Sequence, residues 1–112
     1  MSPSAPSFPK LSNRNYKQWR LDMEARLRIL GALRIVKGTE TRPSFVEPLD
    51  APERCDLHDF DTRMDLAAGE IWSCVEVEQQ SHLEAIRDDP IAMWAKLEAV
   101  HMQKRPGTRF NT

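Results

Sequence analysis

The chain has 112 residues, a length that predicts one domain with a modest hydrophobic core. Hydrophobic residues make up 40% of the sequence and charged residues 29%, which excludes a disordered chain and is typical of a globular protein. No window approaches eighteen uninterrupted apolar residues, and residues 1–6 lack the regions of a signal peptide. A cytoplasmic protein without membrane contact is therefore expected.

The charge is unevenly distributed. Residues 1–50 carry nine basic and five acidic side chains (+4), and residues 51–100 carry four basic and twelve acidic ones (−8). Residues 101–112 add three basic side chains, which brings the net charge to −1. This polarity permits head-to-tail association between copies, or weak attraction of a polyanion to the basic ends.

The first element expected is a helix that follows a flexible, Pro-rich arm over residues 1–12. In this arm only Phe8 and Leu11 can dock onto the folded body. Asn13 or Asn15 can cap the free N–H groups of the helix. Apolar residues at helical spacing predict its buried face: Tyr16, Trp19, Met23, Leu27 and Leu30.

The same helix has a second apolar stripe. Leu21, Ala25 and Ile29 recur every four residues and lie roughly 140–220° from Tyr16 at 100° per residue, opposite the buried face. A helix packed on one face only should be polar there. Two interpretations are open: Phe8, Leu11 or the Pro-rich loop folds over the stripe, or the stripe meets another subunit.

Gly31 should break or bend this helix, and residues 32–37 should continue as a short turn of helix, with Leu33 and Val36 inward and Gly38 as its terminator. Residues 39–52 contain three prolines and predict a loop. Three of its apolar side chains are candidates for pinning it to the core: Phe45, Val46 and Leu49.

A long helix is expected from about Glu53 to somewhere near 76–80. Its inward positions follow a 3/4 spacing: Leu57, Phe60, Met64, Ala67 or Ala68, Ile71 and Val75. Ser81 is expected to cap a short helix through Ile86. Asp89 and Pro90 form the clearest start signal in the chain, an N-cap followed by an N1 proline.

The last helix should turn four side chains inward, Met93, Trp94, Leu97 and Val100 or His101, and end before residues 105–107. The predicted fold is all-α, a compact bundle of four to five helices with a long Pro-containing loop. The helical domain is expected over residues 13–104, and residues 105–112 are expected to form a tail or linker.

Catalysis and cofactor binding are not predicted. The sequence contains no nucleophile elbow and no Gly-rich phosphate loop. Cys55 and His58 form one loose C-x-x-H pair, whereas zinc needs four converging ligands, so neither a metal site nor another cofactor is expected. Basic residues near both ends are candidates for weak RNA contacts: Arg14, Lys17, Arg20, Arg28, Lys104 and Arg105.

Three blocks of sequence resemble the Gag polyproteins of Copia-type LTR retrotransposons. The first block is carried by Leu11, Asn15, Tyr16, Trp19, Leu27 and Gly38. The second has Phe60, Ala67 and Ile71, with Phe60 where a Trp is commoner in the family. The third is the Trp-x-x-Leu helix of Trp94 and Leu97 after Asp89. The likeness covers roughly residues 8–104.

The resemblance implies a helical domain like the N-terminal half of a capsid, which assembles with copies of itself into virus-like particles around RNA. Its partners would be other copies, the remaining segments of Gag and, indirectly, RNA. Two other functions stay open: a domesticated adaptor that binds a cellular protein or peptide, and a weak RNA-binding module.

Overall fold

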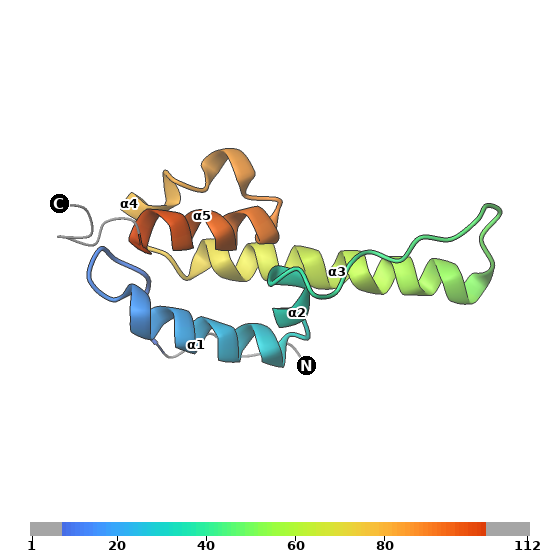
Figure 1. Ribbon diagram of the computed structural model, residues 1–112, viewed down its shortest axis with the longest axis horizontal. Coiled ribbons are helices and arrows are strands. Elements are labelled where there is room, and N and C mark those ends of the chain that lie inside the picture. The colour runs from blue at the N-terminus through green and yellow to red at the C-terminus, as the bar shows by residue number, and fades with distance from the viewer. Residues whose placement is uncertain (1–7, 103–112) are drawn as a thin grey trace, which may run out of the picture.

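The computed structural model describes residues 8–102, which form a helical bundle (Figure 1). Five α-helices follow in order: α1 (Tyr16–Ile29), α2 (Leu33–Val36), α3 (Ala51–Ser73), α4 (Val77–Gln80) and α5 (Pro90–Met102). A short 3-10 helix lies between the last two, over Glu84–Ile86. The all-α prediction is confirmed, and the described residues contain no strand.

Helix α1 begins directly after Asn15, but the side chain of Asn15 does not cap it. Asn15 Oδ1 instead accepts a hydrogen bond from the backbone N–H of Ser12 (2.8 Å), and Asn15 Nδ2 donates to the carbonyl of Lys10 (3.0 Å). The predicted cap is therefore wrong, because the amide is used to bend the chain that leads into the helix. The other candidate cap, Asn13, lies within this turn.

Two glycines set the limits of α2. Gly31 has φ +75 and Gly38 has φ +83, a region that side chains other than glycine rarely adopt, so both glycines turn the chain as predicted. Between them Ile35 and Val36 are buried, whereas Leu33 is only half-buried. The inward position of Val36 is thus confirmed, and Ile35 was missed.

Helix α3 starts at Ala51, two residues before the predicted start. Asp50 Oδ1 accepts from the backbone N–H of Glu53 (2.9 Å), and Glu53 Oε1 accepts from the backbone N–H of Asp50 (3.0 Å). This reciprocal capping box satisfies two N–H groups that the helix itself cannot pair. The cap therefore places the start of the helix before the region where hydrophobic periodicity is visible.

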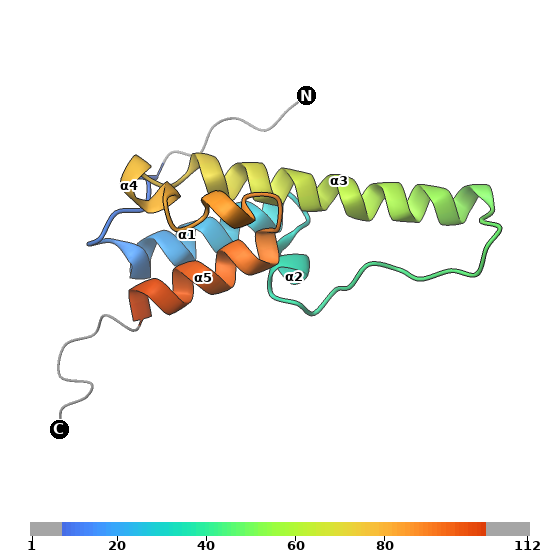
Figure 2. The same cartoon turned by 90° about the horizontal axis from the view of Figure 1, so that it is seen from above.

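The N-terminal half of α3 and the preceding loop project beyond the other helices (Figures 1 and 2). The loop is tied to α3 by ion pairs, Arg63 with Glu40 (2.7 Å) and Arg42 with Asp61 (2.9 Å). Hydrogen bonding from Arg63 lowers the pKa of the Glu40 carboxyl. Val46 is 87% exposed, so the expectation that it pins the loop to the core is wrong.

The chain before α1 joins the end of α3. Leu11 forms a parallel bridge with Val75: its N–H donates to the carbonyl of Cys74 (2.9 Å), and its carbonyl accepts from Glu76 (2.9 Å). Helix α3 ends at Ser73, earlier than predicted, because the chain after it pairs with Leu11. Leu11 is fully buried, so the folded domain begins inside the predicted arm of residues 1–12.

The segment between α3 and α5 is less regular than predicted. Ser81 lies at the C-terminal end of α4, where its hydroxyl donates to the carbonyl of Glu78 (3.0 Å), so it caps no following helix. The predicted start of α5 is confirmed, since Asp89 Oδ1 accepts from the backbone N–H of Ala92 (3.1 Å). Residues 103–112, which include the expected tail, lie outside the described residues.

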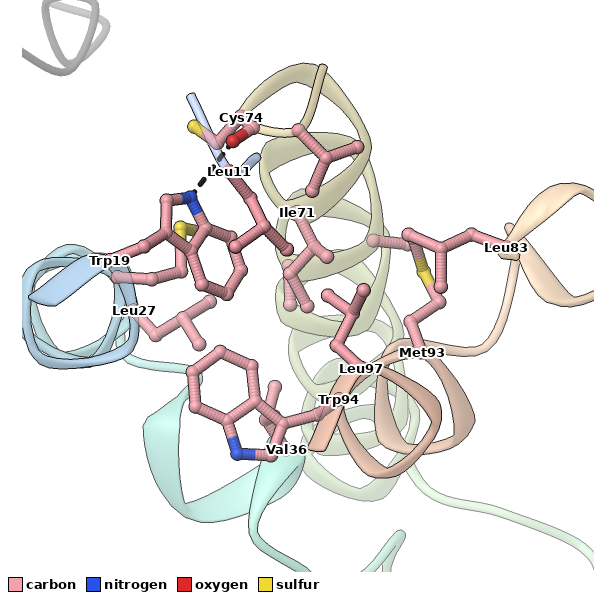
Figure 3. Close-up of a cluster of buried hydrophobic side chains, with 14 of the residues drawn as sticks. Leu11, Trp19, Leu27, Val36, Ile71, Cys74, Leu83, Met93, Trp94 and Leu97 are labelled. Atoms are coloured by element: carbon pink, nitrogen blue, oxygen red, sulfur yellow. Dashed lines mark hydrogen bonds between the residues drawn. The ribbon is translucent and has the colours of Figure 1, made fainter. Parts of the chain in front are cut away.

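The core lies between α1, α2, α3 and α5 (Figure 3). Trp19, Ile71, Trp94 and Leu97 belong to one buried cluster, as predicted, and the two indole rings lie 5.9 Å apart between centroids. Phe60 is also buried, but outside that cluster, beneath the guanidinium of Arg63 at 5.8 Å. Phe60 is thus turned inward, as predicted, but it does not join the common core, because α3 carries it out toward the loop.

Trp94→Ala should lower the free energy of unfolding by about 3–5 kcal/mol, because it removes a buried indole and leaves a cavity beside Trp19. Urea denaturation followed by circular dichroism measures this loss, which is a large share of a small domain's stability. Val77→Ala is the control, since Val77 is 79% exposed. A Trp94 variant as stable as the Val77 variant would contradict the packing.

Candidate self-association surface

The second apolar stripe of α1 lies on the surface. Leu21 is 52% exposed, Ile29 is 72% exposed, and Ala25 between them is exposed as well. Helix α1 runs along the lower edge of the bundle in Figure 1, with the other described helices on its inner side. The three side chains therefore form an uncovered apolar surface, which we call the α1 stripe.

The prediction that the chain's own segments cover the α1 stripe is wrong for the described residues. Leu11 is buried at the bridge to Val75, and Phe8 packs against the core cluster. The Pro-rich loop extends along α3, away from α1 (Figure 2). Within residues 8–102 the stripe has no intramolecular cover, and its contact with another subunit stays a prediction.

Helix α1 holds the stripe on a rigid support. Its opposite face buries Trp19, Met23 and Leu27 almost completely. Two ion pairs fasten its flanks, Arg26 to Glu70 of α3 (2.8 Å) and Glu24 to Lys37 after α2 (3.2 Å). The Arg26–Glu70 pair is largely shielded from water, with side chains 12% and 18% exposed. A surface on such a helix is already ordered before any partner binds, which lowers the cost of association.

The basic candidates at the start of α1 share one groove. Arg14, Lys17 and Arg20 line a hollow of about 450 Å³ together with Tyr16 and His101. Tyr16 and His101 stack face to face, with centroids 4.9 Å apart and planes 3° apart. Burial, followed by the nearby carboxylate of Glu98, raises the pKa of the Tyr16 phenol. The groove combines positive charge with a stacked aromatic pair.

The remaining basic candidates are not brought to this groove. Arg28 lies near the other end of α1 and lines a separate hollow with Arg34 and Arg63. Lys104 and Arg105 lie outside the described residues. The basic groove therefore offers three cations of the six predicted.

A buried polar network behind the groove was missed by sequence reasoning. Gln79 is 1% exposed; its Nε2 donates to Asn13 Oδ1 (2.9 Å), and its Oε1 lies 2.8 Å from His101 Nε2. Because a carbonyl oxygen only accepts, His101 carries its proton on Nε2 in this contact. The network joins α4, the turn before α1 and the end of α5. No local pattern marks this burial, because the partners of Gln79 lie 66 and 22 residues away in the sequence.

Another hollow, of about 560 Å³, lies along the N-terminal half of α3 and includes Cys55 and His58. Asp59, which also lines it, is paired with Arg63 at 3.0 Å. Within residues 8–102 no group of three or more metal-binding side chains is placed to hold an ion. No helix in that range is both long and apolar enough to cross a bilayer.

The residues that carried the family resemblance differ in their structural roles. Most pack the bundle: Leu11, Trp19, Leu27, Ala67, Ile71, Trp94 and Leu97 in the core cluster, and Tyr16 against it. Asn15 and Gly38 turn the backbone, and Phe60 lies outside the cluster.

Comparison with protein families, with curated proteins and with solved structures finds no match. The likeness to Copia-type Gag stays a prediction.

The two cysteines should differ sharply in reactivity. Burial, with Glu70 nearby, raises the pKa of the Cys74 thiol to about 11, so only ~0.1% is thiolate at about pH 8. Cys55 is exposed. An aromatic disulfide reagent should modify one thiol per native chain quickly and the second only after unfolding. Cys55→Ser should remove the fast phase, and two fast thiols in the native protein would contradict the burial of Cys74.

Proposed function

We propose that this chain is a structural assembly domain whose function is weak, repeated contact between copies through the α1 stripe. The observation that carries the proposal is an apolar surface, Leu21–Ala25–Ile29, held in the open on a helix whose other face is firmly packed. Solvent-exposed apolar side chains that align along one helix are a recurrent mark of protein–protein contact sites.

The size of the stripe favours a weak contact. Stable complexes usually bury about 1,200–2,000 Å² in total, and three side chains on one helix supply only part of this area. A weak contact suits a shell or lattice, in which many simultaneous contacts raise the overall affinity without any single strong one. The separation of charge between residues 1–50 and 51–100 would assist further contacts between copies.

The resemblance to Copia-type Gag supports the same function and makes it more specific. Such a domain would be the N-terminal half of a capsid, assembling into virus-like particles either in an active element or in a domesticated descendant. The all-α bundle is compatible with this role. An adaptor that binds a cellular protein through the same stripe would also use a rigid α1. Unlike an assembly domain, such an adaptor would be monomeric in the absence of its partner.

The basic groove of Arg14, Lys17 and Arg20 favours a second candidate, weak RNA contact. Several cations on one surface attract phosphates in a salt-dependent way, and aromatic side chains stack on unpaired bases. The stacked pair of Tyr16 and His101 lies beside these cations, but the two rings already stack on each other. Assembly through the α1 stripe is therefore the function that the geometry supports best.

Leu21→Asp combined with Ile29→Asp should abolish concentration-dependent association in sedimentation velocity, because two charges would enter an apolar contact. Both side chains are exposed, so the helical circular dichroism signal and the melting temperature should change little. The matched control is Val46→Asp with Val77→Asp, two exposed valines away from α1. Unchanged association in the α1 variant would remove the stripe from the interface, and unfolding would assign it to the core.

Raising the salt concentration from about 50 mM to 500 mM should weaken self-association of the unmodified chain, because attractions between exposed charges are screened beyond the Debye length. Sedimentation at both concentrations measures the change. Association that strengthens with salt would indicate purely apolar contact. A parallel series with single-stranded RNA tests the second candidate, weak RNA contact. The sedimentation coefficient of an RNA-binding module would rise only when RNA is present.

A further inference from the structure

The α1 stripe is symmetrical about its middle residue. At 100° per residue and about 1.5 Å rise, Leu21 and Ile29 lie about 40° to either side of Ala25 and about 6 Å before and after it along the axis. A small residue thus lies between two large ones of equal size. This symmetry has a consequence for pairing, since an isologous contact requires a patch that is complementary to itself.

We propose that two copies pair through antiparallel α1 helices, with Ala25 on the two-fold axis. This inference rests on the proposed self-association. In such a pair Leu21 packs beside Ile29 of the partner subunit, and Ala25 faces the partner's Ala25. Large side chains then flank the centre on both sides, and the small central residue allows the helices to approach closely.

The charges beside the stripe distinguish antiparallel from parallel pairing. One flank of the stripe carries Glu24 and Arg28, and the other carries Asp22 and Arg26. An antiparallel two-fold brings equal flanks together. Arg28 then lies within about 3 Å along the axis of the partner's Glu24, and Asp22 comes equally close to the partner's Arg26. Each of these opposite-charge pairs occurs twice in the dimer.

A parallel two-fold brings unequal flanks together and reverses this balance. Arg28 then lies within about 3 Å along the axis of the partner's Arg26, and Glu24 comes equally close to the partner's Asp22, so each of these like-charge pairs occurs twice. One opposite-charge pair, Glu24 with the partner's Arg26, also occurs twice. Antiparallel pairing also has like neighbours, Glu24 with the partner's Glu24 and Arg26 with the partner's Arg26, but each pair occurs only once.

Ion pairs within the chain weight these charges unequally. Glu24 and Arg26 are only 17% and 12% exposed and are already paired within the chain, Glu24 with Lys37 and Arg26 with Glu70. The flanking charges therefore direct the orientation of the pair more than its strength, as rim charges generally do. A second copy fits the stripe for this reason: its size pattern and its charges are both complementary to themselves in one orientation.

Disulfide trapping tests this orientation, in a Cys55→Ser background that leaves only the buried Cys74. Three single variants are needed: Leu21→Cys, Ala25→Cys and Ile29→Cys. A disulfide requires Cα atoms about 4.4–6.8 Å apart, whereas the two copies of residue 21, or of residue 29, are separated by about 12 Å along an antiparallel pair. One of the mixed chains is labelled uniformly with nitrogen-15, so that the heterodimer has its own mass.

Oxidation of the mixture of Leu21→Cys and Ile29→Cys should give at least ~10-fold more mixed disulfide than either variant gives alone, and Ala25→Cys should cross-link to itself. Equal or greater self-cross-linking of Leu21→Cys would overturn the antiparallel orientation while leaving self-association intact. Sedimentation of the Cys55→Ser chain is run in the same buffer. Association without any cross-link at the three positions overturns the α1 contact, and absence of association overturns the proposed function as well.

Discussion

The carbonyl group of Cys74 is the point on which the rest of the fold depends. It accepts hydrogen bonds from the backbone N–H of Leu11 (2.9 Å) and from Trp19 Nε1 (2.8 Å), as Figure 3 shows for the indole. This carbonyl lies at the end of α3, where no further helical turn can pair it. One otherwise unsatisfied acceptor thereby joins the N-terminal segment, α1 and α3.

The same junction explains why the α1 stripe is open. Because Trp19 is held toward α3 by its indole N–H, the rotation of α1 about its own axis is set, and Leu21, Ala25 and Ile29 are turned outward. Arg26 with Glu70 and Glu24 with Lys37 hold the two flanks in that orientation. The packing of the core and the exposure of the stripe are thus two results of one arrangement.

The two ends of the bundle are held together by different kinds of interaction. One end contains the junction at Cys74 and the Gln79 network, where buried polar groups are paired across three segments. The other consists of α3 and its loop, which are held by exposed ion pairs such as Arg42 with Asp61. Exposed ion pairs contribute little to stability, so the projecting end should open more readily than the bundle.

Local signals in the sequence determined the elements themselves. Helical spacing marked α1, α3 and α5, while Gly31, Gly38 and the pair Asp89–Pro90 marked where elements turn or begin, because each acts on its immediate neighbours. Only the tertiary structure decided that Leu11 belongs to the core, that Phe60 lies outside it, and that the α1 stripe stays uncovered. Those outcomes depend on contacts between residues far apart in the chain, such as the 55-residue separation of Trp19 and Cys74, and no local pattern encodes them.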